Sequence, residues 1–254
     1  MKITEYNKII SANWKMNGSM SLINEFNDYF INNIEKINQS NALIFFPPAP
    51  YFSSLNNVIR NYHHIYLGAQ DCSAYKNSAR TGDISASMIN ELGSHFVLLG
   101  HSERRRLFNE TNELVSKKIK IALEENLKVM LCIGENEDEK NNNMTKKILK
   151  DQIFYSINEN CNPLNTIIAY EPVWSIGSGL IPEVSEIEEI NFFIQNTVKE
   201  KLKIKDNFKI LYGGSVNSKN ISNILKSQLI DGVLVGGASL NSKEFIEIIN
   251  FNLN

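Results

Sequence analysis

The chain has 254 residues, a length that a single barrel of alternating strands and helices commonly reaches. Hydrophobic residues make up 43% of it and charged residues 21%, which suits a large core and excludes a disordered, highly charged chain. The net charge of −2 and a pI near 6.1 exclude nucleic acid as the main partner, because binding to phosphate backbones needs a basic excess.

The cysteines, histidines and apolar runs indicate the cellular compartment and the absence of cofactors. Cys72, Cys132 and Cys161 are far apart and odd in number, and their spacing fits neither a disulfide framework nor a metal site. The four histidines show no metal-binding pair, so we expect no metal and no cofactor. Residues 1–8 lack the apolar region of a signal peptide, and no apolar run reaches the roughly 20 residues that span a bilayer. We expect a cytoplasmic protein without a membrane partner.

Eight short apolar runs recur along the chain at spacings of about twenty to forty residues. Runs of this kind, rich in Ile, Val, Leu and aromatics, are typical of strands buried on both faces. They occupy residues 9–10, 42–46, 65–69, 96–99, 129–133, 166–170, 210–212 and 232–235.

Helical patterns lie between the runs. A first apolar face covers residues 114–123, with Thr111 or Asn112 as its cap. The polar stretch 137–143 is interpreted as a solvated loop after the fifth strand. The clearest helical pattern spans residues 185–203, and Ser185 with Glu188 three residues later indicates a capping box.

A last helical pattern near residues 221–225 takes Asn217 or Ser218 as its cap. Strands that alternate with helices predict βαβ crossovers and a parallel sheet. Eight such strands close into a barrel, so we predict an α/β fold of the (β/α)8 type, forming one catalytic domain over residues 1–254. A doubly wound open sheet is the competing architecture.

In a parallel barrel the functional residues follow the strands, at their carboxyl ends. Two Gly-Gly pairs, at 213–214 and 236–237, follow the last two strands, with Ser215 and Ser239 just beyond them. Barrels commonly bind phosphate at this place, with backbone N–H groups and a short helix directed at the anion. A simple turn is the alternative for either pair alone.

Three titratable side chains also follow strands. Glu171 stands among apolar neighbours and is a candidate general base, although a solvated loop carboxylate is the alternative. His101 is a candidate for polarising a carbonyl or relaying a proton, against a purely structural histidine. Lys15 is a candidate for holding a substrate anion, against an ordinary solvated lysine.

The segment from Trp174 to Gly179 holds two glycines between the candidate base and the next helix, with Pro172 and Pro182 on either side. Such a segment suits a lid that excludes water, and an ordinary loop is the alternative. Together these features indicate proton abstraction next to a carbonyl on a phosphorylated substrate, without fixing which substrate.

The ordered motifs resemble the triosephosphate isomerase family along nearly the whole chain. They are Ala-Asn-Trp-Lys-Met-Asn at 12–17, Gly-Ala-Gln-Asp at 68–71, Gly-His-Ser-Glu-Arg-Arg at 100–105, Cys-Ile-Gly-Glu at 132–135, Tyr-Glu-Pro-Val-Trp-Ser-Ile-Gly-Ser-Gly at 170–179, Tyr-Gly-Gly-Ser-Val at 212–216 and Gly-Val-Leu-Val-Gly-Gly-Ala at 232–238.

The resemblance implies an aldose–ketose isomerase of glycolysis and gluconeogenesis that interconverts dihydroxyacetone phosphate and D-glyceraldehyde 3-phosphate through an enediolate. It implies roles for each matching residue: Glu171 as base, His101 as neutral electrophile, Lys15 as cation and Asn13 in placing the substrate; Gly177, Ser215, Gly236 and Gly237 in holding the phosphate; Glu103 and Cys132 as supporting residues; and Trp174, Ile176 and Gly179 in the lid.

The resemblance also implies a homodimer in which the loop 71–83, with Thr81 and Gly82 at its tip, reaches the neighbouring subunit. The chain departs from the family pattern at a few positions. They are Ser78, Arg80 and Asp83 in that loop, Asn109 where Gly is common, and Leu180, Ile181 and Pro182 after the lid, where the segment looks shorter than usual.

Two other functions remain open from the sequence. Another phosphate-binding barrel enzyme would share the glycine pairs but not the histidine, lysine and lid motifs. An inactive barrel kept as a binding protein would be expected to lose Lys15, His101 or Glu171, and all three are present.

Overall fold

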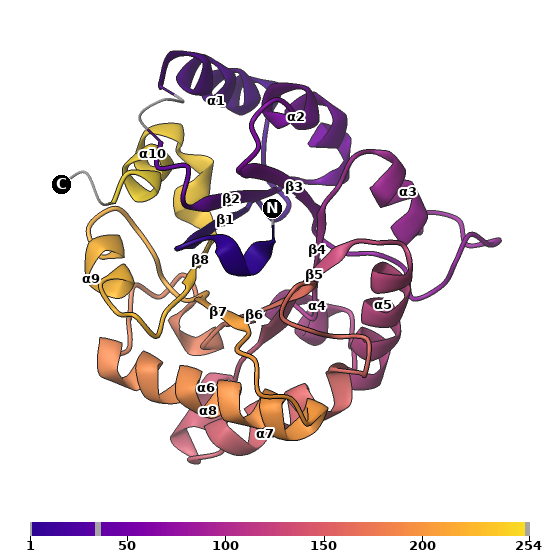
Figure 1. Ribbon diagram of the computed structural model, residues 1–254, viewed down its shortest axis with the longest axis vertical. Helices are drawn as coiled ribbons and strands as arrows, with labels where there is room; N and C mark the ends of the chain where they lie inside the picture. The colour runs from indigo at the N-terminus through magenta and orange to yellow at the C-terminus, as the bar shows by residue number, and fades with distance from the viewer. Residues whose placement is uncertain (1, 34–36, 252–254) are drawn as a thin grey trace.

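The computed structural model describes residues 2–33 and 37–251 and shows a closed barrel of parallel strands surrounded by helices (Figure 1). Each strand pairs in parallel with the next, and β1 pairs with β8 to close the ring. The strands are β1 (Ile9–Asn13), β2 (Ala42–Phe46), β3 (Ile65–Ala69), β4 (Phe96–Leu99), β5 (Lys128–Ile133), β6 (Thr166–Tyr170), β7 (Lys209–Tyr212) and β8 (Gly232–Val235). The predicted (β/α)8 barrel is therefore confirmed, and the doubly wound open sheet is wrong.

Helices follow the strands and cover the outer face of the ring. They are α1 (Met20–Asn33), α2 (Phe52–Ile59), α3 (Ala86–Glu91), α4 (Ser102–Leu107), α5 (Asn112–Glu124), α6 (Glu137–Asn141), α7 (Thr145–Ser156), α8 (Val184–Leu202), α9 (Ile221–Leu225) and α10 (Ser242–Ile249). Short 3-10 helices are η1 (Ile3–Glu5), η3 (Ala49–Tyr51), η4 (Val173–Ser175) and η5 (Gly237–Leu240).

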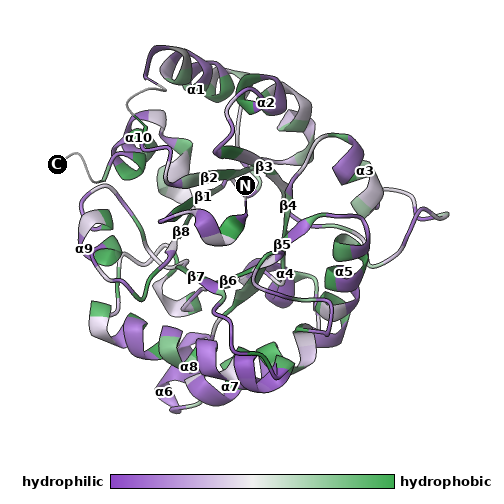
Figure 2. Ribbon diagram, viewed as in Figure 1, coloured by the Kyte–Doolittle hydropathy of each residue, from purple (hydrophilic) through white to green (hydrophobic). Residues whose placement is uncertain are grey.

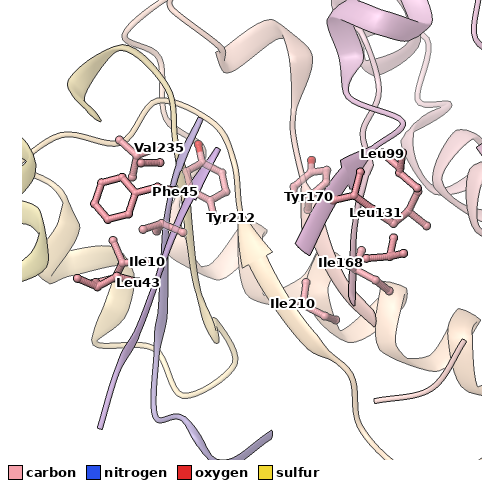
Figure 3. Packing of buried hydrophobic residues seen from close by; sticks show 14 of the residues in the cluster. Ile10, Leu43, Phe45, Leu99, Leu131, Ile168, Tyr170, Ile210, Tyr212 and Val235 are labelled. Carbon is pink, nitrogen blue, oxygen red and sulfur yellow. The ribbon is translucent and has the colours of Figure 1, made fainter. Parts of the chain in front are cut away.

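Alternation along each strand divides the core into two clusters. In β2, Leu43 and Phe45 belong to the cluster that packs against the helices, whereas Ile44 and Phe46 belong to the smaller cluster inside the barrel. Successive side chains of a strand point to opposite faces, so this division is what a closed sheet requires. Figure 3 shows members of the outer cluster from several strands. Figure 2 shows the strands as mainly hydrophobic and α7 and α8 as largely hydrophilic on their visible sides.

The amino-terminal end of the barrel is filled by η1, which lies within the ring of strands in Figure 1. Ile3 and Tyr6 are both 3% exposed and belong to the inner cluster, so they close this end with apolar side chains. Access to the barrel is therefore at the opposite end, where the carboxyl ends of the strands meet.

The predicted strands agree with the observed ones, except that β1 runs on to Asn13 and β5 and β7 each begin one residue earlier than predicted. The cap at Thr111 is confirmed, because its hydroxyl oxygen accepts the N–H of Leu114 at 3.2 Å.

Two other predicted caps are wrong. Helix α8 begins after Glu183, whose carbonyl accepts two N–H groups, and Val184 packs against the core, so Ser185 lies inside the helix instead of capping it. Asn217 caps a preceding turn at Lys219 and Asn220, and α9 starts only after that turn.

The stretch predicted as a solvated loop, 137–143, begins as helix α6. Asn136 accepts the N–H of Glu139 at 2.9 Å, and the Glu139 carboxylate accepts the N–H of Asn136 at 2.7 Å. This capping box fixes the helix start despite the polar composition.

Gly232 leaves no room for a side chain, because a Cβ there would lie 1.9 Å from the carbonyl oxygen of Ile9 in the neighbouring strand. We expect Gly232→Ala to lower the free energy of unfolding by about 3 kcal/mol, since backbone cannot yield without breaking the β1–β8 closure. Urea unfolding measures the change. Gly237→Ala is the control, because no atom of the described residues lies within 4 Å of a Cβ at Gly237. Equal stability of both variants would contradict the prediction.

Candidate active site

A cavity of about 350 Å³ opens at the carboxyl ends of the strands. Residues that face the inside of the barrel also face this cavity. Ile9 and Leu234 belong to the inner cluster, and Asn13 and Gly236, an even number of residues further along β1 and β8, point to the same side. Its wall is formed by residues from the ends of five strands (β1, β4, β6, β7 and β8), from the segment after β6 and from the first turn of α10. They are Asn13, Lys15, His101, Glu171, Ile176, Gly177, Gly179, Gly213, Gly214, Ser215, Val216, Asn217, Leu234, Gly236, Gly237, Ala238 and Glu244.

Glu171 and His101 face each other in this cavity. The Oε1 atom of Glu171 lies 3.1 Å from Nε2 of His101, and the N–H of Ser102 donates to Oε2 at 3.4 Å. Only 2% of Glu171 and 4% of His101 is exposed. Burial by itself raises the pKa of the Glu171 carboxyl, but His101 and Lys15 lower it more, so its net direction is downward and the carboxylate is the stable form.

His101 sits at the start of helix α4, and its Nδ1 accepts the backbone N–H of Glu103 at 3.2 Å. Burial lowers the pKa of the imidazole, while the facing Glu171 carboxylate raises it more, so the net direction is upward. The bond at Nδ1 works against that rise, because only a neutral imidazole can accept a hydrogen bond there. With Nδ1 as acceptor, the ring proton is on Nε2, directed at Glu171.

Lys15 is held at the cavity by an unusual backbone. Its φ is +52°, in the left-handed region that costs a non-glycine residue about 1–2 kcal/mol. Asn13 Oδ1 accepts the Lys15 N–H at 3.0 Å, and Gln70 Nε2 donates to the Lys15 carbonyl at 2.8 Å. The Lys15 ammonium pairs with Glu103 Oε1 at 2.7 Å. The neighbouring residues thus maintain a strained conformation that places one cation at the rim.

The glycine-rich turns form the other side of the cavity. Among residues 2–33 and 37–251, a Cβ at Gly236 would meet only Lys15 Cε, at 3.7 Å, and one at Gly237 would meet nothing within 4 Å. The backbone is thus open to close approach by a ligand. Helix η5 begins at Gly237, as expected for a phosphate-binding turn that leads into a short helix.

The segment 174–179 lies with its tip exposed at the cavity mouth. Ser175 joins it to the glycine turn after β7, because its carbonyl accepts the Ser215 hydroxyl at 2.7 Å and its own hydroxyl donates to Leu180 O at 2.6 Å. Gly177 and Gly179 have φ values of +71° and +76°, and in the described part of the chain no atom lies within 4 Å of a Cβ at either position.

Most of the residues singled out from the sequence meet at this cavity. Those that line it are Asn13, Lys15, His101, Glu171, Ile176, Gly177, Gly179, Ser215, Gly236 and Gly237. Glu103 lies behind Lys15 as its partner. Cys132 is buried beside Glu171, and burial followed by the Glu171 charge raises the pKa of its thiol well above the usual range, so the thiol stays protonated.

Three predicted residues lie elsewhere. Trp174 points away from the cavity and donates its indole N–H to Glu135 Oε1 at 2.9 Å. Thr81 and Gly82 are exposed on the segment between β3 and α3, and Gly82 borders a separate cavity of about 430 Å³.

Several site residues were missed by the sequence analysis. Gln70 orients Lys15, although it lies within one of the quoted motifs. Asn217, Leu234 and Glu244 line the cavity, and Glu244 comes from the first turn of α10. Leu234 was recoverable from strand alternation, whereas the position of α10 depends on tertiary packing.

Within residues 2–33 and 37–251, no cluster of three or more His, Cys, Asp or Glu side chains is arranged to bind a metal. Across the same ranges, no helix combines the length and apolar character needed to cross a membrane.

Comparisons with known proteins agree along nearly the whole chain. The family model described as triosephosphate isomerase matches residues 8–252. The triosephosphate isomerase of Buchnera aphidicola subsp. Schizaphis graminum is 41% identical over 249 residues, covering 96% of this chain and 97% of that protein. That of Thermodesulfovibrio yellowstonii is 39% identical over 248 residues, covering 96% and 99%. The crystal structure of triosephosphate isomerase from Bartonella henselae has a TM-score of 0.84 at 30% identity, covering 98% and 100%.

A barrel with acid–base groups on one side of its mouth and open glycine turns on the other is the architecture of barrel enzymes that act on small phosphorylated molecules. The chain belongs to the triosephosphate isomerase family and is an isomerase.

Gly213 sets the position of the carboxylate, because a Cβ there would lie 2.8 Å from Cγ of Glu171. We expect Gly213→Ala to push the carboxylate away from its place and lower kcat by about tenfold to a hundredfold, since reacting groups must be aligned within a fraction of an ångström. Steady-state kinetics measures kcat, and thermal unfolding serves as the control for folding. A folded variant with kcat within twofold of the original would contradict the prediction.

Proposed function

We propose that this isomerase interconverts dihydroxyacetone phosphate and D-glyceraldehyde 3-phosphate at the cavity, as a single catalytic domain over residues 1–254, in glycolysis and gluconeogenesis. The observation that carries the proposal is the buried contact of 3.1 Å between Glu171 and His101, beside Lys15 and opposite the glycine turns. An ionised base, a neutral donor and a cation around one cavity suit proton transfer next to a carbonyl.

The reaction breaks a C–H bond beside the carbonyl. The Glu171 carboxylate takes that proton, and the electron pair moves onto the carbonyl oxygen to give an enediolate. The His101 Nε2–H, which faces Glu171 in the described structure, donates to the oxygen and stabilises its charge. A glutamate base beside a neutral histidine is the arrangement for which triosephosphate isomerase is itself the usual example. His101 gives its Nε2 proton to this first oxygen and takes the hydroxyl proton of the second. Glu171 then returns its proton to the adjacent carbon, where the second oxygen becomes the new carbonyl.

Lys15 supplies positive charge to the same oxygen and to the phosphate. Its ammonium is fixed by Glu103 at 2.7 Å, so little reorganisation is needed when charge develops. Asn13 holds the Lys15 backbone through its Oδ1 atom and faces the substrate from β1. Cys132, protonated and buried beside Glu171, supports the base without taking part in proton transfer.

The phosphate is assigned to the backbone of Gly177, Ser215, Gly236 and Gly237, which line the open side of the cavity. Gly177 belongs to the proposed lid with Trp174, Ile176 and Gly179, so phosphate binding and lid closure are coupled. Closure keeps water from the enediolate, whose phosphate would otherwise be eliminated. No metal or cofactor takes part in these steps.

We place the protein in the cytoplasm as a homodimer. Its three cysteines are free and buried, which suits a reducing compartment. The segment between β3 and α3, which contains Thr81 and Gly82, projects beyond the helices in Figure 1. Tyr75 and Phe108 border the cavity beside it and are 52% and 62% exposed, so a second subunit would remove large apolar side chains from water.

The residues that depart from the family pattern, here and at Asn109, are compatible with the local structure. Arg80 pairs with Asp83 at 2.6 Å and stacks over Tyr75 at 4.2 Å. Asn109, where Gly is common in the family, has a φ of +53°, and Asn tolerates this left-handed conformation better than most residues. These departures keep the local backbone shape with different side chains.

Glu171→Asp tests the catalytic proposal. The shorter side chain withdraws the carboxylate by about 1 Å, so we expect kcat to fall by a hundredfold or more, roughly, with little change in stability. A coupled assay of triose phosphate interconversion measures the effect. Incorporation of deuterium from deuterated water into the product reports on the same proton transfer. Near-normal turnover in this variant would reject Glu171 as the base.

Phe108→Asp tests the dimer. Sedimentation of the unchanged protein should give the mass of two chains, and the substitution should raise the dissociation constant by about 30-fold or more, as loss of a buried aromatic anchor does. The control is Phe192→Asp, because Phe192 is 64% exposed and lies on α8. A monomeric unchanged protein, or equal effects of both variants, would refute the proposed interface.

A further inference from the structure

Trp174, the first residue of the proposed lid, is held outside the cavity by two groups. Its indole N–H donates to Glu135 Oε1 at 2.9 Å, and the Nζ atom of Lys140 lies 3.3 Å from the centroid of its ring. A cation at this distance over a tryptophan face is strongly attracted to the ring. Trp174 is therefore fixed from its edge and from its face at once.

Lys140 also contacts the helix that follows the lid. Its ammonium lies 3.4 Å from Oε1 of Glu186, which belongs to the first turn of α8. The chain leaves Trp174, passes through the exposed tip and returns to α8, so one ammonium group contacts both flanks of the segment. Lys140 itself is anchored on α6, whose start is fixed by the capping box of Asn136 and Glu139.

The charge of Lys140 also matters for Glu135. Glu135 is 1% exposed, accepts from Tyr170 and Trp174 through Oε1, and its Oε2 has no hydrogen-bond partner among the described residues. Burial raises the pKa of this carboxyl, while its hydrogen bonds and the Lys140 charge lower it, with a net upward direction. Lys140 thus favours the ionised form, which is the better acceptor for the Trp174 indole.

The tip of the described lid borders the mouth of the cavity without being covered. Residues 177–179 are exposed, and no atom of the described residues lies within 4 Å of a Cβ at Gly177 or Gly179. Closing over a ligand requires the segment to leave this position, and with it the contacts that Trp174 makes to Glu135 and Lys140. Those contacts are therefore present in the open arrangement described here.

We infer that Lys140 is a positioning residue that stabilises the open lid by bridging Trp174 at its start and Glu186 in the first turn of α8, the helix that follows it. The inference rests on the proposed function, because it assumes that 174–179 closes over the phosphorylated substrate. It implies that removal of the ammonium group shifts the lid toward closure and strengthens binding of ligands that require the closed form.

The test compares Lys140→Met, Lys140→Arg and Glu186→Gln. Met keeps the length and apolar character of the stem but loses the charge, whereas Arg keeps both the charge and the stacking. The matched control is Lys146→Met: Lys146 pairs with Glu189 of α8 at 2.7 Å and lies 5.9 Å from the Phe193 ring, so it has the same kinds of partner away from the lid.

Two measurements report on whether the lid is open or closed. The first is the inhibition constant of phosphoglycolate, whose carboxylate mimics the enediolate and which should favour the closed form. The second is Trp174 fluorescence in a Trp14→Phe background, in which Trp174 is the only remaining tryptophan. Trp14 is fully buried and its Nε1 has no partner among the described residues, so Phe loses no hydrogen bond there.

We expect Lys140→Met to lower the inhibition constant by about fivefold and to shift the Trp174 emission of the free protein toward that of the bound protein. Lys140→Arg should restore both values, Glu186→Gln should lower the constant by about twofold, and Lys146→Met should change neither. An unchanged or weaker affinity of Lys140→Met would overturn the inference, and so would an equal effect of Lys146→Met. If Lys140→Met fails to fold, Glu186→Gln decides by the same criteria.

The result separates this inference from the proposed function. Normal isomerase activity and a phosphoglycolate-induced change in Trp174 emission, without an effect of Lys140→Met, would reject Lys140 alone. If phosphoglycolate causes no change in Trp174 emission in the protein that keeps Lys140, then the segment 174–179 does not close, and this inference is rejected. The assay of Glu171→Asp would still test the chemistry separately.

Discussion

Glu171 and His101 place a carboxylate oxygen and an imidazole nitrogen 3.1 Å apart with almost no exposure to water. A carboxylate buried alone would become protonated, because a low-dielectric environment disfavours charge. The imidazole, the Lys15 ammonium and the N–H of Ser102 reverse that tendency and keep Glu171 ionised. The barrel serves this contact by bringing the ends of β4 and β6 to the same mouth.

The cation beside this pair depends on local strain that other residues maintain. Lys15 adopts a left-handed backbone, and Asn13, Gln70 and Glu103 hold its N–H, carbonyl and ammonium. Strain of this kind persists only where surrounding contacts over-determine it. The proposed roles of Lys15 and Asn13 are consequently linked, since the same amide that faces the cavity also fixes the lysine backbone.

The proposed lid, residues 174–179, connects the cavity to the outer helices. On its inner side Ser175 is joined to Ser215 of the glycine turn after β7, and on its outer side Trp174 is joined to Glu135 and Lys140. Because each of these polar contacts is modest in water, exchanging them on the proposed closure would cost little free energy. In the proposed function, a ligand phosphate bound to Gly177 and the glycine turns would favour the closed position.

The sequence by itself determined the alternation of strands and helices and most of the residues at the site. Continuous apolar runs marked every strand because a barrel strand is buried on both faces, and polar residues after those runs marked the rim because parallel strands end on one side. The tertiary structure decided what depends on contacts between distant segments. It set the start of α8, where packing of Val184 outweighed the local signal of Ser185, and it gave Gln70 and Lys140 their partners. Trp174 also points away from the cavity, because its indole N–H donates to the buried Glu135 carboxylate in the turn after β5. No local sequence pattern reveals that contact.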